Sequence, residues 1–338
     1  MQKKGSAAAV AIISRMPPRV ACLSPYDEGT VQAMFKGRHE VEVTLVPPPP
    51  DQHAVAMACA AADLVIADRR HKHRIDRDVL ARMTRCRLIQ QAAVGFDSID
   101  HRAAAELGIP VANAAGYNRE SVADWTVMAM IALIRHSFAL DRQIRAGSWS
   151  ADDLMRGPET LGHELGAMTV GIIGMGNVGS AVVRRLAAFG STILFADTLR
   201  RDIDGARQVD LDTLLAQSDI VCVHTPLDVD TRALIGRREL ARMKKGAYVI
   251  NAARGPIVDE GALVAALKAG HLGGAGLDVF EVEPLPKESP LRELENVILA
   301  PHRGGATVEA DMRLIEMVGE NLVRVLDGHS PRNVVNGL

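Results

Sequence analysis

Short apolar runs alternate with longer stretches of helical character along almost the whole chain. Strands that are separated by helices form βαβ units, whose strands lie parallel in one sheet. The pattern therefore predicts an α/β fold with parallel sheets. The runs predicted as strands are Val20–Ser24, Val41–Val46, Leu64–Ala67, Leu88–Gln91, Thr169–Ile173, Thr192–Ala196, Ile220–Val223, Ala247–Asn251, Gly274–Asp278 and Val297–Ala300.

Two longer stretches predict extended helices. One runs from about Arg119 to Arg145, and Gly147 just beyond it is the residue type that most often ends a helix. The other is amphipathic and runs from Thr307 to Leu326. The chain has 338 residues, more than one hydrophobic core usually organises, so we expect two domains.

The composition excludes several classes of protein. Hydrophobic residues make up 48% of the chain, charged residues 24%, and the formal net charge is -2. This balance is typical of a soluble globular protein, and it lacks the basic excess of a nucleic-acid binder. The longest apolar stretch, Val122 to Ile134, contains Asp124 and falls short of the roughly 18 residues that span a membrane. We expect neither a nucleic-acid nor a membrane partner.

The four cysteines fit a reducing compartment, and we expect a cytoplasmic protein. Cys22 and Cys222 lie in apolar runs, as buried cysteines do. No Cys-x-x-Cys pair occurs, so we expect no metal site. Residues before Met16 include a short apolar stretch with no polar cleavage region after it. We expect a leader without ordered structure there, rather than a signal peptide.

The motif Gly174-Met175-Gly176-Asn177-Val178-Gly179 follows a predicted strand and precedes a helix-forming stretch, Ser180–Ala188. In that context the glycines allow a tight turn, approach of a pyrophosphate and close packing of helix on strand. The helix N-terminus then faces the phosphates. Asp197 ends the next strand, 18 residues after Gly179, where the ribose-binding acid is expected. Its carboxylate favours NAD over NADP, although Arg200 and Arg201 could hold a 2′-phosphate.

Three further residues each lie just beyond a predicted strand: Arg254, Glu283 and His302. Ligands bind at the carboxyl ends of strands in open α/β sheets. An arginine there can bind a carboxylate through two hydrogen bonds, and a histidine is the usual acid or base near neutral pH. Taken alone, each could equally be a solvated loop residue, because sequence spacing does not bring them together.

These motifs, in this order and spacing, resemble the D-isomer-specific 2-hydroxyacid dehydrogenase family. The resemblance extends from about Arg19 to Leu326 and is strongest between Gly171 and Gly305. It implies hydride transfer between NAD(H) and C2 of a small D-2-hydroxy or 2-oxo acid, such as glyoxylate, hydroxypyruvate or a phosphoglycerate. It also implies a Rossmann-type NAD-binding domain at 117–305. A discontinuous, flavodoxin-like substrate domain would comprise 1–116 and 306–338, with a cleft between the two domains.

The resemblance assigns roles to residues. Arg254 matches the arginine that binds the substrate carboxylate. His302 matches the histidine that acts as acid and base, and Glu283 matches the carboxylate that pairs with this histidine. The residues implied at the cofactor are Gly174, Gly176, Asn177, Val178, Gly179, Asp197, Thr225, Pro226, Thr231, Asn251, Ala252, Ala253, Arg254, Asp278, His302 and Gly304. Those implied at the substrate are Val94, Gly95, Phe96, Asn118, Arg254 and His302.

Three positions and one loop bear on how this chain fits the family. Asp124 stands where the family more often has Glu. Glu283 is not the Gln of formate dehydrogenases, and Val94 is not the Lys of phosphite-oxidising members, so neither substrate is expected. The loop Asp68-Arg69-Arg70-His71 does not match the phosphoglycerate-type pattern, although its arginines leave an anionic substrate open.

The same residues are compatible with two alternative functions, and one apolar stretch bears on the oligomeric state. A regulator or corepressor of the same fold could keep the same residues and sense NAD, and a Rossmann-type enzyme could perform unrelated chemistry. The stretch Val122 to Ile134 is apolar on more faces than a surface helix needs. This predicts a homodimer in which the helix forms part of the contact; the alternative is a helix wholly buried within its own core.

Overall fold

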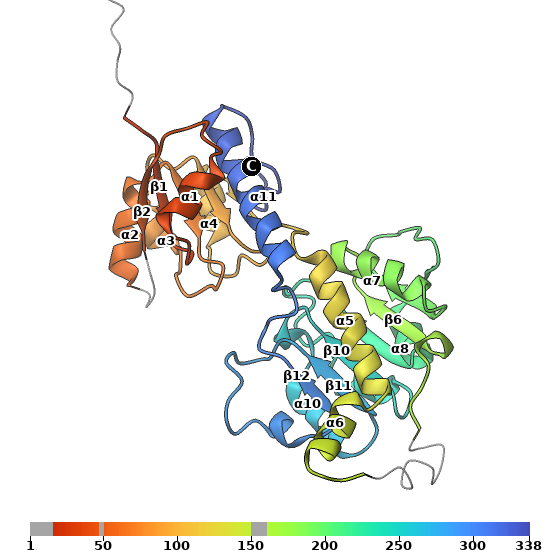
Figure 1. The fold of residues 1–338 in the computed structure, drawn as a ribbon. Helices are drawn as coiled ribbons and strands as arrows, with labels where there is room; N and C mark the ends of the chain where they lie inside the picture. The colour runs from red at the N-terminus through yellow and green to blue at the C-terminus, as the bar shows by residue number, and fades with distance from the viewer. Residues whose placement is uncertain (1–15, 47–50, 150–160) are drawn as a thin grey trace, which may run out of the picture. The chain divides into compact units, whose positions relative to one another are not determined.

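A computed structural model describes residues 16–46, 51–149 and 161–338 (Figure 1). The predicted leader before Met16 lies outside the described residues. The chain divides into two compact units, Met1–Tyr117 with Met312–Leu338, and Asn118–Asp311. The sequence placed the two domain boundaries at 116/117 and 305/306. In the described part of the chain, no helix combines the length and apolarity that crossing a membrane requires.

The first unit is built on a five-stranded parallel sheet with the order β2-β1-β3-β4-β5, the flavodoxin-like order. Side chains alternate across β1. Val20 and Cys22 pack on one face with α1 and α11, while Ala21 and Leu23 pack on the other with α2 and α4. The elements are β1 (Arg19–Cys22), α1 (Glu28–Met34), β2 (Glu42–Leu45), α2 (Gln52–Ala61), β3 (Leu64–Ala67), α3 (Arg77–Leu80), β4 (Leu88–Gln91), α4 (His101–Glu106), β5 (Val111–Ala112) and most of α11 (Val308–Leu326).

The second unit holds a seven-stranded parallel sheet with the order β12-β11-β10-β9-β6-β7-β8. Around β6 this is the Rossmann order, with one further strand. Helices α5 and α7 cover one face, and α8, α9 and α10 cover the other. The elements are α5 (Arg119–Ile134), α6 (Ser137–Arg145), β6 (Thr169–Ile173), α7 (Asn177–Ala187), β7 (Thr192–Ala196), β8 (Arg207–Gln208), α8 (Leu211–Gln217), β9 (Ile220–Val223), α9 (Arg237–Arg242), β10 (Tyr248–Asn251), α10 (Glu260–Lys268), β11 (Gly274–Leu277) and β12 (Val297–Leu299).

The α/β prediction is confirmed, and the predicted strands are present within one or two residues at each end. Two strands, β5 and β8, were not predicted. Each has only two residues, too few to form a pattern, and each exists because a neighbouring strand pairs with it. The C-terminal helix begins as predicted, since Thr307 caps it by accepting a hydrogen bond from Ala310 N through Oγ1.

The prediction of one helix from Arg119 to Arg145 is wrong. The helix breaks after Ile134, because His136 adopts a left-handed backbone conformation with φ 52°. The carbonyl of Ile134 accepts a hydrogen bond from His163 N, at 2.9 Å, instead of continuing the helical ladder. Two different helices result. α5 is largely buried, whereas α6 has no buried residue and ends before Gly147, as predicted.

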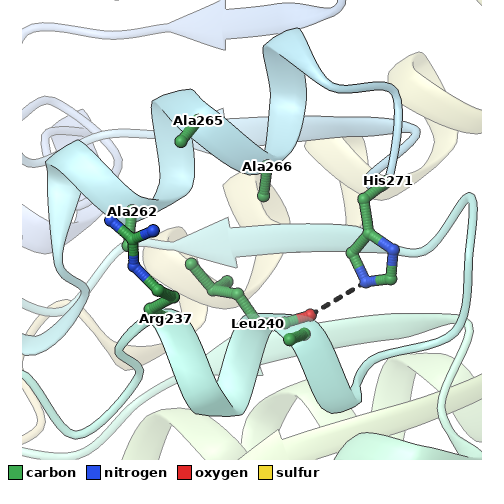
Figure 2. Close-up of a pocket in the computed structure, with 7 residues that line it drawn as sticks. Arg237, Leu240, Ala262, Ala265, Ala266 and His271 are labelled. Carbon is green, nitrogen blue, oxygen red and sulfur yellow. Dashed lines mark hydrogen bonds between the residues drawn. The ribbon is translucent and has the colours of Figure 1, made fainter.

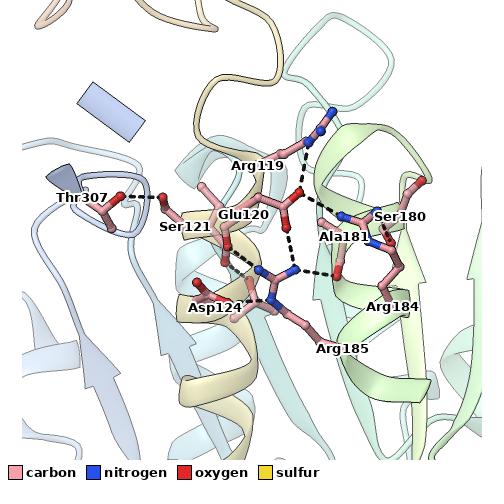
Figure 3. Close-up of polar contacts among 11 residues, drawn as sticks. Arg119, Glu120, Ser121, Asp124, Ser180, Ala181, Arg184, Arg185 and Thr307 are labelled. Atoms are coloured by element: carbon pink, nitrogen blue, oxygen red, sulfur yellow. Dashed lines mark hydrogen bonds and ion pairs between the residues drawn. The ribbon is translucent and has the colours of Figure 1, made fainter. Parts of the chain in front are cut away.

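An arginine joins α7 to the start of α5 (Figure 3). Nη1 of Arg185 donates to Glu120 at 2.9 Å and Nε donates to Asp124 at 2.6 Å, while Arg184 reaches the other oxygen of Glu120. The hydrogen bond from Arg185, with the neighbouring arginine charges, holds the pKa of Glu120 below its ordinary value. These contacts fix α5 against α7, the helix whose first turn includes the last residues of the glycine motif.

Candidate active site

The predicted site residues of the second unit gather at one edge of its sheet. Because the strands are parallel, their carboxyl ends meet at the same edge. The glycine motif follows β6, Asp197 follows β7 and Thr225 lies two residues after β9. Arg254, Glu283 and His302 follow β10, β11 and β12, which are neighbours in the sheet. The fold therefore brings together three residues whose association sequence spacing could not establish.

The glycine motif has the geometry that a dinucleotide needs. A Cβ at Gly179 would lie 2.3 Å from Gly174 O, so helix α7 packs directly on the turn. A Cβ at Gly176 would meet nothing within 4 Å, which leaves open space above the backbone for a pyrophosphate. α7 begins at Asn177, earlier than predicted, so the backbone N–H groups of Asn177 and Val178 belong to its first turn. These residues fit the cofactor that the sequence implies.

Asp197, which follows the next strand, is hydrogen-bonded to the glycine motif. One carboxylate oxygen accepts from Met175 N and the other from Leu199 N, both at 2.8 Å, and Arg201 Nε lies 3.4 Å away. Partial burial alone would raise the pKa of Asp197, but these hydrogen bonds and the Arg201 charge hold it below its ordinary value. Asp197 is therefore a carboxylate at neutral pH, and Arg201 already interacts with it.

The loop after β9 is held by its own hydrogen bonds. Thr231 Oγ1 donates to Pro226 O at 2.7 Å and accepts from Asp228 N at 2.7 Å. Thr225 precedes this turn, and Thr225 N lies 2.8 Å from where a Cβ on Gly174 would stand. The loop thus packs against the glycine motif, and its role at the cofactor stays a prediction.

A buried asparagine shapes the Arg254 loop. Asn251 Nδ2 donates to Arg254 O at 2.9 Å, and Asn251 Oδ1 accepts from Ala253 N at 3.1 Å. The turn also carries Ala252, which is half-buried. Gly255 follows because a Cβ there would lie 1.9 Å from the backbone of Phe280. Close contact with the Phe280 backbone therefore places the Arg254 loop beside the loop that carries Glu283.

Glu283 and His302 form a hydrogen-bonded pair, with Nδ1 of His302 2.8 Å from Oε2 of Glu283. The other carboxylate oxygen accepts from Phe280 N at 3.1 Å. Burial alone would raise the pKa of Glu283, but the hydrogen bond and charge of His302, with the charge of Arg254, hold it below its ordinary value. With Nδ1 engaged, Nε2 is the nitrogen that can exchange a proton with a substrate.

Asp278 and Gly304 are in direct contact behind this pair. Asp278 follows β11 and is buried, and Gly304 N donates to its Oδ2 at 2.7 Å. The sequence implied a place beside the cofactor for both residues. The observed contacts also tie them to the backbone of the His302 loop.

The remaining predicted substrate residues lie elsewhere. Val94, Gly95 and Phe96 follow β4 in the first unit, where Asn113 Nδ2 donates to Val94 O at 2.7 Å. Within the described residues the backbone N–H groups of these three donate no hydrogen bond. Asn118 belongs to the second unit and precedes α5, with its side chain against Gly305. Their substrate role stays a prediction.

A separate hollow of about 290 Å³ lies between α9 and α10 (Figure 2). Its walls are mostly apolar, with His271 Nε2 3.0 Å from Leu240 O at one end and Arg237 at the other. It contains none of the predicted site residues. We therefore place the candidate active site at the sheet edge and not in this hollow.

Sequence reasoning missed His224, the first residue after β9. Its Nε2 is inaccessible and has no hydrogen-bond partner among the described residues, and burial lowers its pKa to about 4. The only sequence signal was its place between a predicted strand and Thr225. That position indicated the edge of the site but not the side-chain environment.

Comparison with known proteins gives consistent matches. Residues 127–304 match the sequence family described as D-isomer specific 2-hydroxyacid dehydrogenase, NAD binding domain. A glyoxylate reductase from Korarchaeum cryptofilum is 42% identical over 266 residues, which cover 78% of this chain and 80% of that protein. A glyoxylate reductase structure from Paecilomyes thermophila has 30% identity and a TM-score of 0.85, over 95% of this chain and 98% of that one. The structure of D-lactate dehydrogenase from Aquifex aeolicus, complexed with NAD and lactic acid, has 28% identity and a TM-score of 0.82. The match covers 95% of this chain and 99% of that one.

Proposed function

Because this chain belongs to the D-isomer specific 2-hydroxyacid dehydrogenase family, we propose that His302, Glu283 and Arg254 carry out its reaction. The chain is an NAD-dependent oxidoreductase that acts on the CH–OH group of 2-hydroxy acids. The observation that carries the residue assignment is the His302–Glu283 pair, 2.8 Å apart at the sheet edge that also bears the glycine motif. An acid/base pair beside a dinucleotide loop is what this chemistry requires.

Each of these residues has its own role in the reaction. NADH, which the glycine motif and Asp197 would hold, would supply the hydride that C2 of the 2-oxo acid accepts. Protonated His302 donates its Nε2 proton to the carbonyl oxygen, and Glu283 stabilises the imidazolium before the transfer. Arg254 binds the substrate carboxylate through its guanidinium, which presents paired donors. In oxidation, neutral His302 accepts the hydroxyl proton.

We infer that the substrate is a short 2-oxo acid such as glyoxylate, since the relatives described above include glyoxylate reductases at 42% and 30% identity. One observation favours a second candidate, a substrate with another anionic group. The loop after β3 carries Arg69, Arg70 and Lys72, and His71 Nδ1 in that loop lies 3.1 Å from Ser98 Oγ, close in sequence to Phe96. A cationic loop there suits a phosphorylated 2-oxo acid.

One experiment tests the function and separates the substrates. Glyoxylate, hydroxypyruvate, pyruvate and 3-phosphohydroxypyruvate are each offered with NADH, and the loss of near-ultraviolet absorbance gives kcat/KM. The highest value is expected for a short acid. A higher value for the phosphorylated acid that falls selectively in Arg70→Ala supports the second candidate. NADH binding without turnover of any acid would overturn the enzymatic proposal and favour a regulator.

We propose that NAD is preferred over NADP. A carboxylate at Asp197 accepts from both ribose hydroxyls and repels a 2′-phosphate. The arginine that could hold such a phosphate, Arg201, is instead within 3.4 Å of Asp197.

We propose a homodimer that uses α6. The apolar character of Val122–Ile134, which first suggested a dimer, is largely explained by burial of α5 within its own unit. By contrast, Phe138 and Ile144 of α6 and the nearby Trp149 are 45%, 54% and 82% exposed. Large apolar side chains that gather on one surface segment are typical of a contact between proteins. Light scattering should give a dimer at micromolar concentration, and Phe138→Ser with Ile144→Ser should shift it to monomer.

We propose a cytoplasmic location, because Cys22, Cys59, Cys86 and Cys222 are all free thiols. Cell fractionation with a tagged chain tests this directly. Recovery from an oxidising compartment would count against it.

A further inference from the structure

The C-terminal segment that follows α11 pairs with the edge of the first sheet. Val334 forms an antiparallel bridge with Ala112 of β5, and Val335 N donates to Val111 O at 2.8 Å. Asn336 adds a side-chain bond, since its Oδ1 accepts from Val111 N at 3.0 Å. The two-residue strand β5 is therefore held on the side away from β4 by residues more than 200 positions along the chain.

Asn113, which directly follows β5, connects this segment to the loop after β4. Its backbone N–H donates to Asn333 O at 3.1 Å, and its side-chain Nδ2 donates to Val94 O at 2.7 Å. Its Oδ1 accepts from Ala115 N at 3.2 Å, which fixes the orientation of the amide group. Asn113 is 7% exposed, so water competes little for these bonds. This residue thus joins the C-terminal segment to the Val94–Phe96 loop.

The Val94–Phe96 loop has few hydrogen bonds of its own. As noted above, its three backbone N–H groups donate none within the described residues. Successive N–H groups at the carboxyl edge of a parallel sheet can bind an anion such as a carboxylate. Their direction depends on how the loop backbone is held. Asn113 holds it at Val94 O, and Ile99 N holds it at Phe96 O, at 3.0 Å.

The bond between Asn113 and the C-terminal segment depends on an unusual backbone conformation. Asn333 has φ 56°, in the left-handed region, as has His302 with φ 54°. Residues with a side chain adopt this conformation at a cost, and β-branched residues adopt it least readily. The side chain of Asn333 is exposed. A substitution there can therefore change the backbone preference without disturbing the core.

We propose that Asn113 is a positioning residue for substrate binding: together with the C-terminal segment 333–336, it holds the Val94–Phe96 loop in the conformation that receives the substrate carboxylate. This deepens the proposed function and rests on it. The loop N–H groups would add donors for the carboxylate that Arg254 also binds. Because the three proposed catalytic residues belong to the other unit, Asn113 should govern substrate affinity and not the hydride step.

Asn113→Asp tests the side-chain link with almost no change in volume. At neutral pH a carboxylate cannot donate to Val94 O, whereas the backbone bond to Asn333 can remain. We expect KM for glyoxylate, hydroxypyruvate and pyruvate to rise about 10-fold or more, because a lost contact to a charged group has an effect of this order. We expect kcat to change less than about threefold, as for a contact made equally in the ground and transition states.

The division between KM and kcat separates positioning from a general structural role. A loss of folded enzyme would lower kcat and leave KM unaltered, and that outcome would overturn the proposal. Weaker NADH binding as the main effect would overturn it as well. Asn296→Asp is the matched control. Asn296 Nδ2 also donates to a backbone carbonyl, that of Gly273 at 3.2 Å, but in the other unit and at the amino-terminal edge of its sheet.

Two variants at Asn333 test the link to the C-terminal segment. Asn333→Val disfavours the left-handed conformation, so Asn113 N loses its acceptor, whereas Asn333→Gly permits that conformation. KM should rise in Asn333→Val and stay at the wild-type value in Asn333→Gly, with kcat preserved in both. Equal KM values for the two variants would show that the C-terminal segment does not act on the loop.

Hydrogen exchange gives a readout that needs no turnover. The backbone amide of Ile99 donates to Phe96 O and so reports on the loop. Its exchange should accelerate in Asn113→Asp and in Asn333→Val, and stay unchanged in Asn296→Asp. If wild-type protein reduces no 2-oxo acid but this acceleration is seen, the proposed function fails while the link to the loop stands. Unchanged exchange in Asn113→Asp shows that Asn113 does not hold the loop, whatever the activity.

Discussion

Nδ1 of His302 lies 2.8 Å from Oε2 of Glu283, so the two side chains form a hydrogen-bonded pair at the edge of the sheet. Because His302 and Arg254 hold the pKa of Glu283 below its ordinary value, this carboxylate stays ionised throughout the neutral range. An ionised partner at this distance favours the imidazolium, which is the form that donates a proton. In the proposed reduction, His302 would use this form to protonate the carbonyl oxygen.

The charge of Glu283 should set the pH dependence of turnover. Glu283→Gln removes that charge, so the imidazolium of His302 loses its counter-charge. The alkaline limb of the reduction profile should move towards acid. For oxidation, which needs neutral His302, the acid limb should move the same way. The measurement is kcat against pH in both directions, and identical profiles for wild type and Glu283→Gln would show that the pair does not govern turnover.

Replacing His302 with Ala should remove the proton donor while leaving the glycine motif and Asp197 intact. We expect kcat to fall about 10²–10⁴-fold, the range typical of a positioned acid or base. Fluorescence titration should give an NADH Kd close to that of wild type, because the glycine motif is untouched. A deuterated cofactor shows whether hydride transfer limits the rate. A His302→Ala enzyme with near wild-type kcat would remove this residue from the chemistry.

Cofactor choice should depend on Asp197. In Asp197→Ser the repulsion of a 2′-phosphate is lost and Arg201, now 3.4 Å from the carboxylate, is released. The ratio of kcat/KM for NADH over NADPH should fall by about 10-fold or more, since losing a charge-assisted contact costs on the order of 1.5–3 kcal/mol. Asp212→Ser is the control, because it removes an exposed carboxylate that lies on α8 and pairs with Arg242, outside the predicted cofactor residues. A wild-type preference for NADPH contradicts the assignment outright.

His224 should make the fold sensitive to mild acid. The unfolded chain binds a proton on this residue with a pKa near 6.5, whereas burial lowers the folded pKa to about 4. Between these values the unfolded state binds more protons, so the free energy of unfolding should fall as pH drops from 6.5 to 4. His224 should account for about 1–3 kcal/mol of that fall.

Urea unfolding of wild type and His224→Asn between pH 7.5 and 4.5 isolates this contribution. Other groups titrate in both proteins, so the comparison is between the two slopes of the free energy of unfolding against pH. A flatter pH dependence in His224→Asn is expected. Equal slopes would show that His224 is protonated as readily in the folded protein as in the unfolded chain.

The sequence was a good guide to elements whose pattern is local. Apolar runs such as Thr169–Ile173 predicted their strands, because strands buried on both faces are apolar at most positions. The break after Ile134 was not predictable in this way. It depends on His163, far along the chain, whose backbone N–H donates a hydrogen bond to the Ile134 carbonyl. No proline or glycine marks the position.

The same distinction applies to the site. Strand ends predicted that Arg254, Glu283 and His302 each face the carboxyl edge. Their association depends on the order β12-β11-β10 in the sheet, which no short-range pattern encodes. Asp278 was placed near the cofactor by resemblance, yet its bonds to three successive N–H groups appear only when β11 and the loop after β12 lie side by side.

The left-handed backbone of His302 has an evolutionary consequence. At φ 54° a residue with a Cβ costs roughly 1 kcal/mol relative to glycine, so His302→Gly should melt at a higher temperature than His302→Ala, although both lack the proton donor. Equal melting temperatures would show that the conformation carries no such cost. Selection for stability and selection for turnover therefore act in opposite directions at this position. In a lineage that no longer needed the reaction, this histidine should be among the first residues to drift.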